Sequence, residues 1–167
     1  ILIGLVGSEM CIRDRDKSVP GYLLAGSIYG PSYISFEYAM SYYGLIPEAV
    51  YTVTSATFEK KKKKRYETSF GTFTYCDVPA EAFPLELILV QEGDYFYRIA
   101  SPEKAVCDKL YTMSPTANIK ELYTLLADDL RIDMDALKKL DQSKLAQLSG
   151  KYHSTNVKKL CSLIRRL

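Results

Sequence analysis

The spacing of hydrophobic side chains predicts an amphipathic helix over residues 35–44. Ser35 is a favourable N-cap residue at its start, and Gly44 suits the C-terminal cap, with Pro47 blocking continuation. The hydrophobic positions recur at the i, i+3, i+4, i+7 spacing of one helix face, and they are Phe36, Ala39, Met40 and Tyr43.

After this helix the pattern changes to short runs rich in β-branched and aromatic residues, which is typical of strands. One strand is expected at residues 51–56. A hairpin is expected where residues 66–68 and 72–75 flank Ser69-Phe70-Gly71, because glycine accepts the unusual backbone angles of a tight turn. A second hairpin is expected from strands at 85–90 and 95–99, on either side of Glu92-Gly93-Asp94.

From residue 101 the spacing becomes helical again. Ser101, Pro102 and Glu103 form a favourable helix start. Further helices are expected over 118–127, from Asp133, and from Ser154, with a segment ending at Gly150 that extends or restarts the third helix. The side chains expected to face inward are Val106, Leu110, Met113, Ile119, Leu122, Tyr123, Leu126, Leu137, Leu140, Leu145, Leu148, Val157, Leu160, Cys161 and Ile164.

This order of elements predicts an α+β fold with a mixed or antiparallel sheet, an N-terminal helix and a helical C-terminal third. Residues 16–31 form a short lead-in with little periodicity. Residues 32–167 are long enough for a single domain, with its sheet in about 32–100 and its helices in about 101–167. Nothing resembles the ~18 apolar residues of a membrane span, so a cytoplasmic protein is expected.

Charge is unevenly distributed, although the net charge is only +2. Six cations stand together at residues 60–65, namely Lys60, Lys61, Lys62, Lys63, Lys64 and Arg65. Such a run could bind a nucleic-acid backbone through its phosphates, independently of sequence. It could equally be a solvated loop whose lysines protect a sheet edge from pairing with another chain.

Candidate chemistry is sparse. Phosphate-binding loops and nucleophile elbows are missing from the sequence, and His153 is the only histidine. No catalytic residue, metal site or cofactor is therefore predicted. Cys76, Cys107 and Cys161 are irregularly spaced and are expected to be small buried thiols. Glu67, Asp77 and Glu86 lie near expected strands, but their spacing does not mark them as a set of metal ligands.

The first residues have an unusual origin. Leu5 to Arg15 match, residue by residue, one reading frame of a transposase mosaic-end sequencing adapter. We therefore expect residues 1–15 to be artefactual, the native chain to begin near Asp16, and deletion of Ile1 to Arg15 to leave the fold intact.

Several linked motifs between residues 32 and 111 carry a family resemblance. They comprise residues 33–48, 50–55, 70–75 and 99–105, followed by Asp108 and Leu110-Tyr111. Their order and gaps resemble those of the AbiEi family of type IV antitoxins. The matching positions of most interest are Tyr33, Ser35, Gly44, Pro47, Thr52, Thr54, Gly71, Tyr75, Pro102, Glu103, Lys104 and Asp108.

The sequence departs from the family pattern at two places. Thr68-Ser69 stands where relatives tend to read Thr-Pro, and Tyr75-Cys76-Asp77 where they tend to read Tyr-Arg-His. The second change removes two potential cations beside the sheet, which weakens the case for nucleic-acid contact there.

The resemblance implies a non-catalytic antitoxin and transcriptional regulator that opposes a nucleotidyltransferase-like toxin without a stable complex. It also implies that an N-terminal winged helix, truncated here, reads the operator DNA of its own operon. Two alternatives stay open. One is a nuclease-like nucleic-acid enzyme using Glu67 or Asp77, and the other is a protein-interaction domain with a tyrosine-rich face, since the chain has 14 tyrosines.

Overall fold

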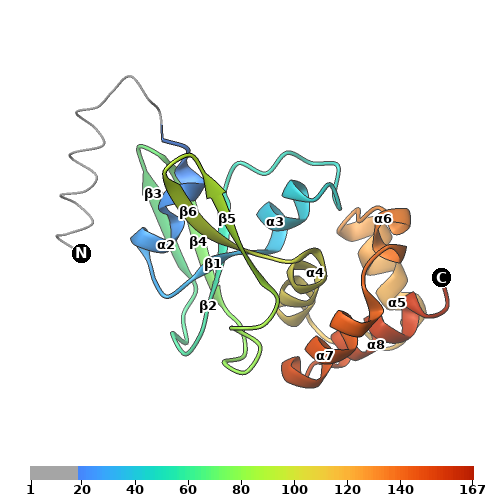
Figure 1. The fold of residues 1–167 in the computed structure, drawn as a ribbon. Helices are drawn as coiled ribbons and strands as arrows, with labels where there is room; N and C mark the ends of the chain where they lie inside the picture. Colours follow the sequence, from blue (N-terminus) through green and yellow to red (C-terminus); the bar gives the residue numbers. More distant parts are fainter. Residues whose placement is uncertain (1–18) are drawn as a thin grey trace.

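The computed structural model describes residues 19–167, so the adapter-like segment Leu5 to Arg15 lies outside the described residues. Figure 1 shows a sheet in the middle of the molecule, a short helical lead-in on one side and the remaining helices on the other. In chain order the elements are η1 (Gly21–Leu24), α2 (Ala25–Ile28), β1 (Tyr33–Ile34), α3 (Phe36–Tyr42), β2 (Val53–Thr57), β3 (Lys64–Thr68), β4 (Gly71–Asp77), β5 (Leu87–Glu92), β6 (Tyr95–Ala100), α4 (Pro102–Tyr111), α5 (Ile119–Thr124), the π-helical turn η2 (Leu125–Asp129), α6 (Met134–Lys138), α7 (Gln142–Tyr152) and α8 (Thr155–Ile164).

The described strands form a mixed sheet of six strands in the order β3-β4-β2-β1-β6-β5. Both expected hairpins, β3–β4 and β5–β6, are antiparallel. Parallel pairing joins β2 to β4 and β1 to β6. The predicted α+β class, with its mixed sheet and helical C-terminal third, is therefore confirmed.

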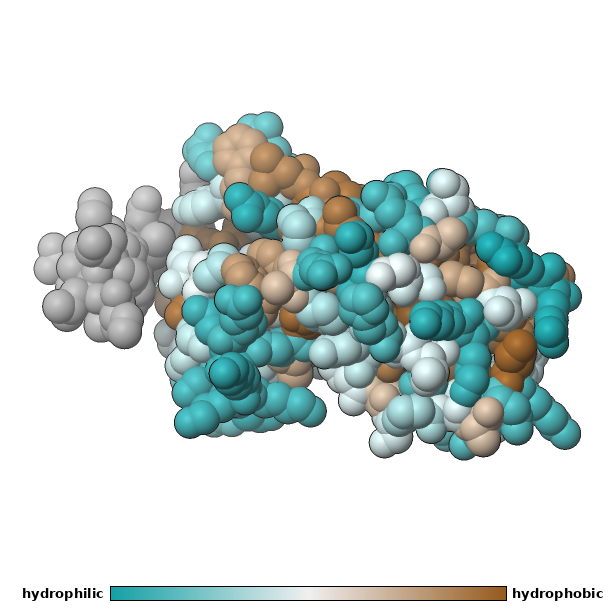
Figure 2. All heavy atoms as spheres, turned by 90° about the horizontal axis from the view of Figure 1, so that it is seen from below, coloured by the Kyte–Doolittle hydropathy of each residue, from teal (hydrophilic) through white to brown (hydrophobic). Residues whose placement is uncertain are grey.

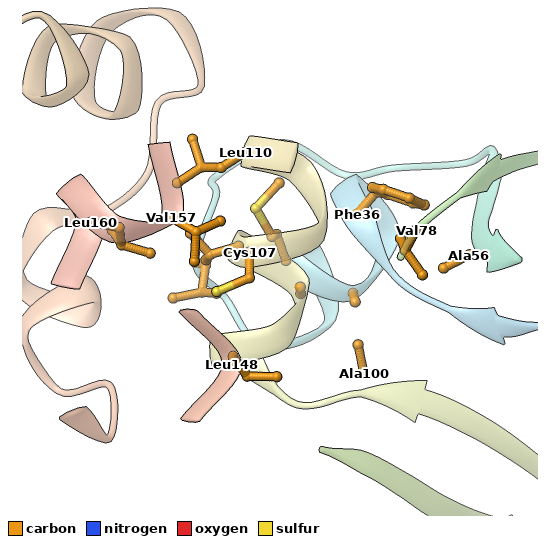
Figure 3. Packing of buried hydrophobic residues seen from close by; sticks show 14 of the residues in the cluster. Phe36, Ala56, Val78, Ala100, Cys107, Leu110, Leu148, Val157 and Leu160 are labelled. Carbon is orange, nitrogen blue, oxygen red and sulfur yellow. The ribbon is translucent and has the colours of Figure 1, made fainter. Parts of the chain in front are cut away.

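Helix α4 is the centre of the hydrophobic core. It packs against α3 on the sheet side and against α7 and α8 on the other. In Figure 3, Cys107 and Leu110 of α4 lie close to Val157 and Leu160 of α8, while Ala100 at the end of β6 lies on the sheet side. These side chains are almost fully buried, so α4 joins the sheet to the helical third through one continuous core.

The lead-in has more structure than its weak periodicity predicts. Residues 21–28 form η1 and α2, which lie against the sheet (Figure 1). Ala25 is buried, and its carbonyl accepts a 2.6 Å hydrogen bond from the Tyr75 hydroxyl of β4. The strand β1 was not expected at all, because two residues are too few to give a periodic signal.

Several expected boundaries were wrong. The strand expected at 51–56 is β2 at Val53–Thr57, and Tyr51 lies outside it with 89% of its surface exposed. The strand expected at 85–90 begins at Leu87. Helix α7 starts anew after the Asp141 cap and continues through Gly150 to Tyr152, because the left-handed conformation that ends it falls on His153.

Two expected inward positions were also wrong. Tyr123 lies in α5, before the π-helical turn η2, and is 41% exposed, because the face of α5 that meets the core is centred on the fully buried Leu122. Met113 follows the end of α4 and is only half-buried.

Candidate functional site

The lysine run lies on the connection between β2 and β3 and continues into β3, an edge strand of the sheet. Its side chains do not form one patch. The Lys60 ammonium lies 5.3 Å from the centre of the Tyr29 ring, whereas Lys63 lines a cleft on the α4 side. Arg65 forms a 3.1 Å ion pair with Glu67. The run is exposed from Lys61 to Arg65, which is compatible with both interpretations of its charge.

The acids considered for a nuclease are not brought together. Glu67 pairs with Arg65 on β3, and Glu86 pairs with Lys144 of α7 at 3.0 Å. Asp77 accepts hydrogen bonds from the Thr57 hydroxyl and from the Lys61 backbone N–H, so it holds the lysine loop in place. Among residues 19–167, no group of three or more His, Cys, Asp or Glu side chains is placed to hold a metal ion.

A cleft of about 540 Å³ lies between the lysine loop and the helical third. Its lining includes the cations Lys63 and Lys109 and the acids Glu121 and Asp129. Lys109 already forms an ion pair with Glu37 of α3. The cleft therefore has mixed charge and selects neither an anion nor a cation.

A buried hydrogen-bond network surrounds the carboxylate of Asp108 in α4. The Tyr33 hydroxyl donates to Oδ2 at 3.0 Å, and the Ser35 hydroxyl donates to the same oxygen at 2.5 Å. The Tyr152 hydroxyl of α7 donates to Oδ1. Asp108 and Ser35 have no exposed surface, and the two tyrosines are at most 2% exposed.

Lys104 lies one helical turn before Asp108 and is equally buried. Its ammonium donates to the Ala82 carbonyl and, at 3.3 Å, to the Tyr152 hydroxyl. It also lies over the Tyr33 and Tyr152 rings, 5.1 and 5.5 Å from their centres, in cation–π geometry. The Tyr152 hydroxyl therefore connects the ammonium to the carboxylate by accepting from one and donating to the other.

Burial dominates the titration of this network. Desolvation raises the pKa of the Asp108 carboxyl, although Lys104 and the three hydroxyl donors act in the opposite direction. Desolvation likewise lowers the pKa of Lys104, and the Asp108 charge opposes that shift. Burial raises the pKa of the Cys107 thiol well above its ordinary value, so this thiol is the inert structural cysteine expected from the sequence.

Ser35 occupies the expected N-cap position of α3, but its side chain does not cap the helix. Thr54 of the neighbouring strand β2 takes this role. Its hydroxyl accepts from the Tyr38 backbone N–H at 3.0 Å and donates to the Ser35 carbonyl at 2.6 Å. This tertiary cap leaves the Ser35 hydroxyl free to bind Asp108.

The family-motif residues thus lie in different parts of the structure. Four of them, Tyr33, Ser35, Lys104 and Asp108, meet in the network, and Thr54 supports it. Glu103 accepts a 3.0 Å hydrogen bond from the Asp141 backbone and so holds the start of α7. The other motif residues lie outside the network. Tyr75 contacts α2 and Pro102 begins α4, whereas Gly44 and Gly71 adopt positive φ at turns. Pro47 and Thr52 lie in the connection between α3 and β2.

Sequence reasoning missed Tyr152 entirely. Its only signal was position, since it follows Leu145 and Leu148 at helical spacing and so continues their buried face. The assumption that Gly150 ended the helix concealed that continuation.

Comparison with models of known protein families, with curated proteins and with solved structures gives no match for this chain. The family resemblance therefore depends on the motif residues alone. In the part of the chain that the structure describes, no helix is both long and apolar enough to cross a bilayer.

Proposed function

We propose that this chain is an antitoxin and regulatory domain of a type IV toxin–antitoxin system. It would oppose a nucleotidyltransferase-like toxin without catalysis of its own and without a stable complex, and it would act in the cytoplasm. Operator DNA of its own operon is the proposed nucleic-acid partner of this regulator.

The convergence of the motif residues on one network supports this proposal. The resemblance selects Tyr33, Ser35, Lys104 and Asp108 by their sequence motifs alone. They come from segments about seventy residues apart, such as those of Ser35 and Asp108. Positions selected by a chance resemblance are not expected to share hydrogen bonds in the folded chain. The network is closed to solvent, and such a group stabilises a fold and cannot reach a substrate.

A growth assay tests the proposal. The chain is co-expressed with a nucleotidyltransferase-like toxin encoded beside its gene, and growth is expected to recover while the two proteins do not co-purify. Asp108→Asn is expected to lose protection, and Asp135→Asn, whose side chain is 84% exposed, is the matched control that retains it. Growth arrest that persists with well-expressed, folded protein would contradict the antitoxin proposal.

We also propose that the lysine run contributes sequence-independent contact with DNA phosphates. Lys61 to Lys64 are exposed, and no ion pair involving them is formed within residues 19–167. Contacts of this kind release counterions, so each phosphate contact adds about 0.9 to the slope of log affinity against log salt.

The lysine proposal is tested by replacing Lys61 to Lys64 with alanine and titrating DNA across a range of salt concentrations. Affinity and salt slope are both expected to fall. The control replaces the same number of exposed lysines in the helical third, at Lys120, Lys138, Lys139 and Lys158, which changes the net charge equally. Equal DNA affinity of the two variants would contradict the phosphate contact and favour the interpretation that the lysines only protect a solvated sheet edge.

The nuclease alternative predicts metal-dependent cleavage that Glu67→Ala abolishes. Because Glu67 and Asp77 are engaged in separate contacts, we expect no cleavage by the unsubstituted chain in the presence of Mg²⁺. Cleavage that Glu67→Ala removes would instead favour the enzyme.

A further inference from the structure

The two edges of the sheet differ in chemistry. The β3 edge carries exposed charges at Lys64, Arg65 and Glu67, which is how natural sheets prevent edge-to-edge pairing. The β5 edge reads Leu-Ile-Leu-Val-Gln from residue 87 to residue 91, a stretch with neither charge nor proline, and Glu92 ends the strand. Figure 2 shows a run of hydrophobic side chains along part of the upper margin of the molecule and a group of hydrophilic side chains at its lower left.

The register of the β5–β6 hairpin determines which backbone groups of β5 point outward. Ser101 donates its N–H to the Glu86 carbonyl, so residues 86 and 101 are a hydrogen-bonded pair. Such pairs alternate along an antiparallel ladder. Ile88 and Val90 therefore bond to β6, whereas Leu87, Leu89 and Gln91 direct their N–H and C=O groups away from the sheet.

We propose that this edge pairs with the same edge of a second copy of the chain, forming a two-fold symmetric dimer through antiparallel β5 strands. With Leu89 opposite Leu89 of the partner subunit on the two-fold axis, Leu87 lies opposite Gln91. All the outward-pointing groups of the three residues are then paired in both copies. A symmetric pair closes on itself, and the edges that remain at the two ends of the joined sheet are the charged β3 edges.

Side chains and charge fit the same register. Leu89 is 64% exposed and Ile88 is 40% exposed, and both would be covered. No charged side chains come opposite each other between residues 87 and 91. At each end of the ladder, Glu86 lies opposite Glu92 of the partner subunit, so two carboxylates approach each other. Lys144 lies 3.0 Å from Glu86 in the same copy and compensates this charge.

The size of the contact sets the expected affinity. A ladder over residues 86–92 is roughly 20 Å long. This is small beside the ~1,200 Å² or more that stable interfaces bury, so the dimer should be weak and concentration-dependent. It is independent of the antitoxin proposal and can fail or hold without it.

Sedimentation equilibrium over a concentration series tests the dimer. The mass-average molecular mass of the unsubstituted chain is expected to rise above the monomer value of 18.9 kDa as the concentration increases. Leu89→Lys places like charges opposite each other on the axis and should hold the mass at that of the monomer. Tyr51→Lys, at another exposed aromatic position, should associate like the unsubstituted chain. A monomer at every concentration, or equal association of Leu89→Lys, would overturn the proposal.

A crosslinking experiment keeps the proposal testable if Leu89→Lys does not fold. Cα atoms of a hydrogen-bonded antiparallel pair are about 5.5 Å apart, within the roughly 4.4–6.8 Å that a disulfide spans. Leu89→Cys is expected to form a disulfide-linked dimer on mild oxidation, faster than Tyr51→Cys or the unsubstituted chain. Equal rates for the two cysteine variants would count against the β5 pairing.

Discussion

At the scale of single residues, the buried network explains why a lysine and an aspartate tolerate complete burial. Lys104 and Asp108 each keep hydrogen-bond partners, and Tyr152 connects them. A buried charge is stable only when such partners replace water. Removing one member therefore leaves the others unsatisfied.

Tyr152→Phe removes only the connecting hydroxyl and preserves the ring. We expect the free energy of unfolding to fall by about 1–3 kcal/mol, because Asp108 loses a donor and Lys104 an acceptor in a site closed to solvent. Tyr123→Phe, on an exposed tyrosine, is the control and should change stability by less than about 0.5 kcal/mol. Urea unfolding measures both, and equal stability of the two variants would contradict the network's role.

The raised pKa of Asp108 predicts the sign of a pH dependence. An acid whose pKa is higher in the folded state binds its proton more tightly there. Its contribution to stability is full below the ordinary value of 3.8 and is lost as the pH rises through the folded-state pKa. The stability of the unsubstituted chain relative to Asp108→Asn should therefore decline from acid to neutral pH. A relative stability that increases over this range in urea titrations would show that the pKa is lowered.

At the scale of elements, helix α3 is short and depends on a neighbouring strand for its cap. Thr54 supplies the hydroxyl that Ser35 directs elsewhere. A seven-residue helix has little stability of its own, so its geometry is fixed by β2 and α4.

Thr54→Val keeps the shape of the side chain and removes the cap. The expected loss is about 0.5–2 kcal/mol, the usual range for an N-cap. Thr124→Val, at an exposed threonine, is the matched control. Thermal unfolding followed by circular dichroism would reveal the difference, and an unchanged midpoint for Thr54→Val would mean that the Ser35 side chain caps the helix after all.

At the scale of the whole molecule, α4 belongs to both the sheet and the helical third. The Asp108 network also joins the two parts, through hydrogen bonds, because Tyr33 belongs to β1 and Tyr152 belongs to α7. The expected division near residue 100 is therefore a change in secondary structure within a shared hydrophobic core.

Because the two parts share α4, we expect them to unfold together. Near-ultraviolet circular dichroism reports mainly the part of the chain before residue 101, where 11 of the 14 tyrosines lie, and far-ultraviolet circular dichroism mainly reports the helices. The two signals should give one coincident transition in urea, as two-state behaviour requires. Separate midpoints would show that the helical third is an independent unit.

Local pattern was enough to predict the fold class, both hairpins, the helical third and the Ser101 cap of α4, whose hydroxyl accepts from the Lys104 backbone. These features depend on side chains within a few residues of one another. The parallel pairing of β2 with β4, the Thr54 cap and the Asp108 network join residues 16 to 75 positions apart, and only tertiary packing brings them together. Sequence periodicity records which face of an element is buried, but not which distant polar group replaces water there, and that choice was decided by the folded structure.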